Sequence, residues 1–405
     1  MMKKYLWIFS LAGLLFACNN NEDDPQPVPE KENMTILSYL VANNSLDKDL
    51  LVNIGAMYKG LAGMKEPATL LVYWDGKTKI GDNDVNHLLL KYRTDGKGNI
   101  NGRPSLDVSA TLDEILDEAE IIKEYPSQCS TDKEVMIEVL NDMTNLVTVD
   151  KIGLIAGSHA SSWVPASSSR AFGDDAGKSI QIIDMVEAIA STGRTFDFLL
   201  FDACLMGSAE VCYDFRKVSN FQIVSVLEIP AYGFPYDLML AYLFEGKKEG
   251  YVEACQTYID YYNLKGNSYW GTISLIDSKK MEDLARFLHK EITSHKDLLK
   301  DFKYSTIQEY GRRAYKYCSF DVKQFVKVLN DGVVSSSFDK LLSETVVYAG
   351  CVENPTREFL IDKENYSGIG LYIPIRGKYD WNTYFKTLDW YTAAGWNEVS
   401  FSWNF

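Results

Sequence analysis

The chain has 405 residues, with 41 Lys and Arg against 56 Asp and Glu, which gives a formal net charge of −15. Hydrophobic residues make up 46% and charged residues 24%, values typical of a folded globular protein. The length suits one large α/β domain or two smaller domains. The acidic balance argues against nucleic-acid binding, because phosphate contacts need a basic face. The seven cysteines are irregularly spaced and predict neither a disulfide framework nor a CxxC metal site.

Residues 1–17 have the features of an export signal. Two lysines precede an apolar run that is too short to span a bilayer comfortably. The run ends at residues 15–18 in Leu-Phe-Ala-Cys, which resembles a bacterial lipobox and implies cleavage before Cys18 and a lipid on its sulfur. A plain signal peptide with an incidental cysteine is the alternative. Residues 18–33 are acidic and proline-bearing, which predicts a disordered tether. We therefore expect an exported protein, lipid-anchored to the bacterial cell envelope at the outer membrane or cell surface.

From Thr35 onward, apolar runs of strand length alternate with helix-like stretches. The expected strands are 35–41, 69–74, 151–156, 196–201, 221–227, 269–276 and 368–375. Apolar residues recur every three or four positions in the expected helices, which are 46–61, 111–122, 131–146, 179–190, 205–217, 278–294, 321–329 and 338–349. The alternation predicts an α/β fold with a mostly parallel central sheet flanked by helices. We assign residues 34–265 to this core and the more helical 266–405 to a C-terminal subdomain that elaborates it.

The chain offers little support for a metal or nucleotide site. His289 and His295 lie on a lysine-rich helix without sharing a face well, and His87 has no neighbouring ligands. Because no HExxH, paired CxxC or EF-hand pattern occurs, we expect no dedicated metal site. Residues 173–179 resemble a phosphate loop, but the glycines are one position too close and two aspartates would repel phosphate. A turn followed by a helix cap is the better interpretation.

His159 and Cys204 are singled out because each follows a predicted buried strand. His159 comes after the strand at 151–156 and Cys204 after the strand at 196–201, with a helix-bearing crossover between them. If these strands are parallel neighbours, about 4.8 Å apart, their carboxyl ends meet at one edge of the sheet. Open α/β sheets place their sites at that edge. The alternative is a packed cysteine and a hydrogen-bonded structural histidine.

A Cys–His pair at this edge would suit acyl transfer. We expect Cys204 to open the helix at 205–217, whose dipole would favour thiolate. His159 would protonate the leaving amine and later activate water, while backbone N–H groups of these loops hold the oxyanion. Asp202 would attract an Arg or Lys side chain to the mouth of the site. The remaining cysteines are interpreted as structural: Cys129, Cys212, Cys255, Cys318 and Cys351.

These residues resemble the clostripain family of cysteine peptidases, relatives of the caspases, gingipains and legumains. The family motif Asp-Ala-Cys-Leu-Met-Gly stands intact at residues 202–207, and the segments 170–175 and 228–237 are also similar. The resemblance extends from about Thr35 to the C-terminus. It implies a caspase-like fold and a dyad of His159 and Cys204, with Asp202 lining the pocket for a basic P1 side chain. Further residues expected at the substrate are Ala160, Trp163, Glu228 and Asp237.

The resemblance also implies how such a protein is processed and what it binds. Some relatives mature by self-cleavage between the two catalytic motifs, and Arg170 and Lys178 are the basic residues in that link. Some relatives use calcium, although the sequence itself requires no cofactor. We expect peptide or protein substrates with Arg or Lys at P1, attachment to a membrane through Cys18, no nucleic-acid partner and a monomeric chain.

The other family motif, His-Gly-x-Gly-Trp, is altered at residues 159–163, which are His-Ala-Ser-Ser-Trp. Ala160 keeps a backbone N–H for an oxyanion, but its methyl group narrows the site, and Ser162 disfavours a left-handed turn. The leading hypothesis is an envelope-anchored cysteine endopeptidase that cleaves after Arg or Lys through a thioester. The second hypothesis is a catalytically weak or silent lipoprotein that binds peptides or proteins without cutting. The third is a structural lipoprotein with an unreactive Cys204.

Overall fold

The computed structural model describes residues 32–80, 87–107, 109–166, 171–266, 269–353, 355 and 357–399. Residues 32–405 form one compact unit. The export signal, Cys18 and nearly all of the predicted tether lie outside the described residues. Within the described ranges, no helix has the length and apolar character needed to cross a membrane.

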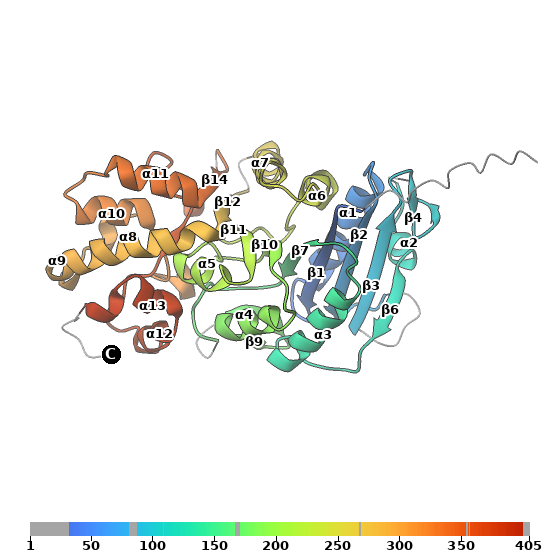
Figure 1. Ribbon diagram of the computed structural model, residues 1–405, viewed down its shortest axis with the longest axis horizontal. Coiled ribbons are helices and arrows are strands. Elements are labelled where there is room, and N and C mark those ends of the chain that lie inside the picture. Colours follow the sequence, from blue (N-terminus) through green and yellow to red (C-terminus); the bar gives the residue numbers. More distant parts are fainter. Residues whose placement is uncertain are drawn as a thin grey trace, which may run out of the picture. The chain divides into compact units, whose positions relative to one another are not determined.

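Over the described residues, a mixed sheet of 11 strands organises this unit (Figure 1). The strands at its centre are all parallel: β11 (Ser219–Val224), β10 (Phe196–Asp202), β7 (Lys151–Gly157), β1 (Met34–Ala42) and β2 (Ala68–Gly76). Antiparallel strands extend both sides, with β12 (Thr272–Asp277) and β14 (Val346–Cys351) beyond β11, and β3 (His87–Thr94), β4 (Asn99–Ile100) and β5 (Arg103–Pro104) beyond β2. The strand β6 (Glu120–Glu124) pairs with β3.

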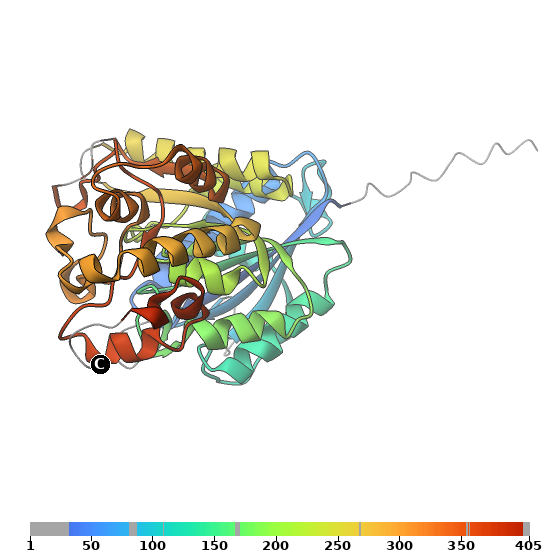
Figure 2. The same ribbon diagram turned by 60° about the vertical axis from the view of Figure 1, so that its left-hand side comes forward.

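Two hydrophobic cores lie on opposite faces of the sheet. Side chains of β1 alternate between them, with Leu37 and Tyr39 in one core and Ile36 and Leu40 in the other. One face is covered by α1 (Asp47–Ala62), α2 (Leu112–Asp117), α6 (Tyr236–Phe244) and α7 (Lys248–Leu264). The other is covered by α3 (Lys133–Asn145), α4 (Ile182–Ala190), α5 (Ala209–Phe215) and α8 (Met281–Ser294), as Figures 1 and 2 show. This double coverage explains why the central strands are continuously apolar.

The C-terminal part of the chain elaborates the same sheet. It adds β12 and β14 to the edge beyond β11, together with α10 (Val322–Leu329), α11 (Ser336–Thr345), α12 (Tyr379–Phe385) and α13 (Asp389–Ala393). The described short elements are α9 (Lys296–Lys300), β8 (Phe172–Asp175), β9 (Lys178–Ile180), β13 (Phe320–Asp321) and β15 (Gly370–Leu371).

Several predicted boundaries were wrong, mainly where a strand joins the sheet from far along the chain. The helix predicted at 111–122 ends at Asp117, and β6 follows because it pairs with β3. The helix predicted at 338–349 stops at Thr345, where β14 begins to pair with β12. The strand predicted at 368–375 shortens to β15, which pairs only with β13. Edge pairing of this kind depends on tertiary position and leaves a weak local pattern.

Candidate functional site

The strand ends that precede His159 and Cys204 are adjacent. β7 and β10 pair in parallel, and their last residues, Gly157 and Asp202, are register partners. His159 and Cys204 each follow two positions later, so both loops leave the same edge of the sheet. The prediction that these strands are parallel neighbours is therefore confirmed.

The loop that carries His159 is fastened to its surroundings on two sides. The His159 ring is half-buried, and its Nε2 lies 2.8 Å from the Ser45 hydroxyl oxygen in the turn between β1 and α1. Its carbonyl oxygen accepts a 2.8 Å hydrogen bond from the backbone N–H of Gly173 in β8. Ala160, 6% exposed, forms an isolated bridge with Phe172. The histidine is thus set between the first turn of the fold and the hairpin β8–β9.

Cys204 is half-buried, and its Sγ lies 3.9 Å from the carbonyl oxygen of Ile229. Burial raises the pKa of the Cys204 thiol to about 12, so the resting side chain is a thiol at neutral pH. The expected helix dipole is not at hand, because α5 begins at Ala209 with Ser208 as its N-cap. The prediction that Cys204 opens a helix whose dipole favours the thiolate is therefore wrong.

The residue after Cys204 has a strained backbone. Leu205 adopts φ +63° although it is not glycine, and its side chain is fully buried. A left-handed conformation costs an L-residue about 1–2 kcal/mol. Its N–H donates a 3.0 Å hydrogen bond to the Leu227 carbonyl, which helps to hold this conformation. Strain of this kind clusters at functional sites, where surrounding contacts over-determine the backbone.

Asp202 is a buried carboxylate at the end of β10, 6% exposed. Its Oδ2 accepts hydrogen bonds from the Tyr236 hydroxyl at 3.0 Å and from Asn53 Nδ2 at 3.2 Å. Burial raises the pKa of Asp202 from 3.8 to about 7, against bonds from Tyr236 and the Phe234 backbone N–H that lower it. Among the described residues, none of the observed ion pairs involves Asp202. A cationic ligand could supply the positive charge that balances the Asp202 carboxylate.

The loop from Ile229 to Tyr236 connects the two sides of this site. Its first residue approaches Cys204, and its end contacts Asp202. Between them, Gly233 has φ +66°, and an added Cβ there would lie 2.8 Å from Asp202 Oδ2 and 2.5 Å from Asn53 Nδ2. Only glycine fits this close approach without movement of the neighbours. The loop therefore contacts both the cysteine and the buried carboxylate.

Two acidic residues expected at the substrate flank this loop. Glu228 is half-buried and forms an ion pair with Arg312, so its charge is already compensated within the protein. This pairing speaks against Glu228 as a free carboxylate for a basic substrate. Asp237 is exposed at the first turn of α6 and lines a cavity of about 270 Å³ together with Asn53 and Tyr232.

Trp163 does not present its ring to a substrate, contrary to the prediction. It is fully buried and donates a 3.1 Å hydrogen bond from Nε1 to the Cys318 carbonyl. The centroid of its ring lies 4.5 Å from that of the Tyr372 ring. Its size and apolar character place it in the core beneath the histidine loop. Ser162, which stands where the family has glycine, adopts φ +65° and donates a 3.1 Å hydrogen bond to the Ser208 hydroxyl.

The two self-cleavage candidates have different standing in the structure. Arg170 lies outside the described residues. Lys178 is exposed at the start of β9, and its backbone is the register partner of Asp175 in the antiparallel strand β8. The segment 173–179 is thus a hairpin with a turn at Ala176 and Gly177, both of positive φ, rather than a helix cap.

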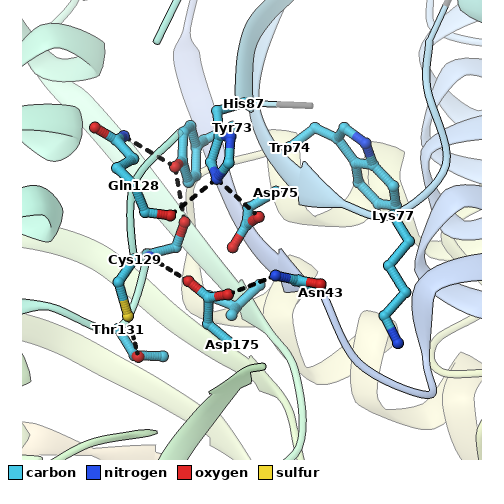
Figure 3. A network of polar contacts seen from close by, with 12 residues as sticks. Asn43, Tyr73, Trp74, Asp75, Lys77, His87, Gln128, Cys129, Thr131 and Asp175 are labelled. Atoms are coloured by element: carbon cyan, nitrogen blue, oxygen red, sulfur yellow. Dashed lines mark hydrogen bonds and ion pairs between the residues drawn. The ribbon is translucent and has the colours of Figure 1, made fainter. Parts of the chain in front are cut away.

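A buried polar network lies at the same sheet edge and was not foreseen (Figure 3). His87, predicted to lack neighbours, has Nε2 3.2 Å from Asp75 Oδ1 and 3.0 Å from the Gln128 carbonyl. Asp175 accepts a 2.8 Å hydrogen bond from Asn43 Nδ2 and a 2.6 Å bond from the Ser130 N–H. The network therefore ties the turn after β1 to the hairpin β8–β9. Sequence spacing carries no signal for such contacts, because their members lie on separate strands and loops.

Calcium would need several oxygen ligands gathered in one place. Over the described ranges, no group of three or more His, Cys, Asp or Glu side chains is placed to hold a metal ion.

Comparison with known proteins identifies the family. The model of the clostripain family, peptidase family C11, matches residues 38–403. A secreted C11 cysteine protease from Bacteroides thetaiotaomicron, in complex with an irreversible peptide inhibitor, is 24% identical with a TM-score of 0.70, over 91% of this chain and 100% of that chain. An inactive zymogen C11 protease from Parabacteroides distasonis is 23% identical with a TM-score of 0.71, over 91% of this chain and 99% of that chain. No curated protein matches the chain. The expected caspase-like α/β fold is confirmed.

Proposed function

The chain belongs to the clostripain family of cysteine peptidases, and we propose that it is an exported endopeptidase that cleaves after Arg or Lys. One observation carries the proposal. The adjacent ends of β7 and β10 bring the loops of His159 and Cys204 to one edge, beside the buried carboxylate of Asp202. A nucleophile, a base and a buried acceptor for a cation are the parts that such a reaction needs.

The P1 side chain of the substrate enters against Asp202. No ion pair to a described basic residue satisfies this carboxylate, so an Arg or Lys side chain would provide its counter-charge. The loop from Ile229 to Tyr236 forms the wall of the pocket and keeps the carboxylate away from water. The scissile carbonyl would then lie over Cys204.

The chemistry begins from a thiol rather than a thiolate. As the Cys204 sulfur bonds to the carbonyl carbon, His159 takes the thiol proton and then passes it to the leaving amine as the C–N bond breaks. This leaves a thioester on Cys204. His159 next takes a proton from water, the resulting hydroxide attacks the thioester, and the thiol leaves with that proton. We assign the backbone N–H of Ala160 to the oxyanion, because replacing glycine by alanine leaves this donor in place.

The first residues support export and anchoring. Residues 1–17 carry the features of a signal peptide and Cys18 completes a lipobox-like sequence. We propose that the mature chain is lipid-anchored to the cell envelope through Cys18. A solved relative is described as secreted, which agrees with export. Mass spectrometry of the membrane fraction tests the anchor, and a diacylglyceryl group on Cys18 would support it. The Cys18→Ala variant should then be released from the membrane without a lipid.

A silent peptide-binding protein is the second candidate. It is favoured by the histidine loop, where Ala160 and Ser162 replace the glycines of the family motif. In this case Asp202 would still bind basic side chains, but the peptide bond would survive. Tight binding of an Arg peptide without turnover distinguishes this candidate from the enzyme.

The test is hydrolysis of fluorogenic peptides with Arg, Lys or a neutral residue at P1, under reducing conditions, with and without calcium. Wild type is compared with Cys204→Ala and with Cys129→Ala, a matched change at another half-buried free thiol. Turnover that depends on Arg or Lys and is lost only in Cys204→Ala supports the enzyme. Folded wild type without turnover in any condition overturns it. Mass analysis of Arg170→Gln and Lys178→Gln locates any self-cleavage.

A further inference from the structure

The turn after β1 contributes a hydroxyl to the histidine, although no sequence motif pointed to it. Ser45 is exposed, and its Oγ lies 2.8 Å from His159 Nε2 across a separation of 114 residues. We propose that Ser45 is a positioning residue that orients His159 and selects its tautomer. This inference rests on the proposed function.

The turn that presents Ser45 is rigid. The buried Asn44 donates from Nδ2 to the Val41 carbonyl at 2.9 Å and to the Asp174 carbonyl at 2.7 Å. Its Oδ1 accepts from the Leu46 N–H at 2.8 Å. These bonds lie on both sides of Ser45 in the chain, so the backbone that carries its hydroxyl is held in place beside the His159 ring.

The same hairpin holds the turn and the histidine loop. Asp175 of β8 accepts from Asn43, and the N–H of Ala176 donates to the Asn43 carbonyl at 3.2 Å. The N–H of Gly173, also in β8, bonds the His159 carbonyl. Figure 3 shows the contact between Asn43 and Asp175. Asp175 also accepts from the Ser130 N–H, and the Ser130 hydroxyl lies 2.8 Å from that of Tyr73. The turn that carries Ser45 and the loop that carries His159 are thus both hydrogen-bonded to the hairpin β8–β9.

The proposed reaction requires the Ser45 hydrogen bond to run from the His159 ring to the hydroxyl oxygen. For His159 to receive the thiol proton on Nδ1, Nε2 must already carry a hydrogen. The Ser45 oxygen then accepts from Nε2–H, and it does so both before and after the ring becomes imidazolium. A hydroxyl can keep this bond throughout the reaction, whereas a ring without it could rotate or take the other tautomer.

Kinetics of Ser45→Ala test the positioning role. We expect kcat/KM to fall about 10- to 100-fold, as small misplacement of a catalytic group does, with an unchanged melting temperature because Ser45 is exposed. Ser45→Thr, which keeps the hydroxyl, should restore activity close to wild type. Lys48→Ala, an exposed change in α1, is the matched control and should retain full activity. Asn44→Ala should lower activity and melting temperature together. Equal activity of Ser45→Ala and wild type overturns the proposal.

A second measurement is independent of turnover. The chain has four histidines, so ¹⁵N-labelled Cys204→Ala protein at pH 8 gives few ring signals, and His159→Gln identifies the relevant one. We expect the Nε2–H tautomer in this background and a mixture once Ser45→Ala is added. Unchanged tautomer populations, or an Nδ1–H ring at the start, overturn the proposal. If wild type shows no turnover but Ser45→Ala still shifts the tautomer as expected, only the proposed function is overturned.

Discussion

Replacing Asp202 by asparagine should separate the stability effect of the buried acid from its role in specificity. The unfolded carboxyl ionises near 3.8, whereas burial raises the folded pKa to about 7. The folded state therefore holds more protons between these values, and the stability that this group contributes is lost as pH rises toward 7. A difference of about three pKa units corresponds to about 4 kcal/mol, of which about 2–3 kcal/mol falls between pH 5 and pH 8.

Asparagine can keep the contacts with Tyr236 and Asn53 while removing the charge. Its carbonyl oxygen, placed where Oδ2 stands, still accepts from Tyr236 and Asn53. The free energy of unfolding of Asp202→Asn relative to wild type should thus be about 2–3 kcal/mol more favourable at pH 8 than at pH 5. Urea denaturation in the Cys204→Ala background, followed by tryptophan fluorescence, measures this without self-digestion. A difference that does not change with pH would refute the argument from burial.

Whereas the stability of Asp202→Asn relative to wild type should improve as pH rises, its activity toward Arg substrates should fall. Without the carboxylate, kcat/KM for an Arg substrate should fall about 10²- to 10³-fold, as expected when one partner of a buried ion pair is removed. The value for a neutral P1 residue should change little. In wild type, KM for Arg should fall as pH rises toward 7, because the ionised acid binds the cation. Equal losses for Arg and neutral substrates would contradict the pocket role of Asp202.

Glu210 provides a matched control for this experiment. It is fully buried, its pKa is also raised to about 7 by burial, and it accepts a 2.8 Å hydrogen bond from the Tyr372 N–H. Glu210→Gln should therefore show a similar dependence of stability on pH. Since Glu210 contributes to no part of the proposed pocket, its replacement should leave the preference for Arg unchanged.

Three further predictions follow from the loops of the site. Alkylation of Cys204 by iodoacetamide should accelerate about tenfold per pH unit from pH 7 to pH 9, because burial raises its pKa to about 12; a plateau below pH 8, measured against Cys204→Ala, would contradict this. Ser162→Gly should be more stable to urea than Ser162→Ala by about 1 kcal/mol, since both lose the bond to Ser208 but only glycine relieves φ +65°; the reverse order would contradict it. Gly233→Ala should lower stability by at least about 1 kcal/mol and weaken Arg preference, because its Cβ would press on Asp202, and unchanged values of both would count against the wall.

The sequence alone was sufficient to locate the two loops of the site. Buried parallel strands are continuously apolar, and they send their carboxyl ends to one edge of a sheet, so strand-length runs followed by His159 and Cys204 predicted their common edge. The helix expected in the crossover between these strands, at 179–190, corresponds to α4, whereas the order of the strands comes from the structure. Serine at position 162 was expected to disfavour a left-handed turn, yet Ser162 keeps φ +65° in the structure.

Tertiary structure decided what surrounds those loops. Ser45 is 114 residues from His159, and Asn53 is 149 residues from Asp202, yet each pair is hydrogen-bonded. The pairing of Glu228 with Arg312, the burial of Trp163 and the edge strands β6 and β14 depend equally on distant partners. Hydrophobic periodicity encodes which face of an element is buried, because burial is a local property of side chains. It does not encode which polar groups meet across the fold, because those contacts arise only when separate elements are packed together.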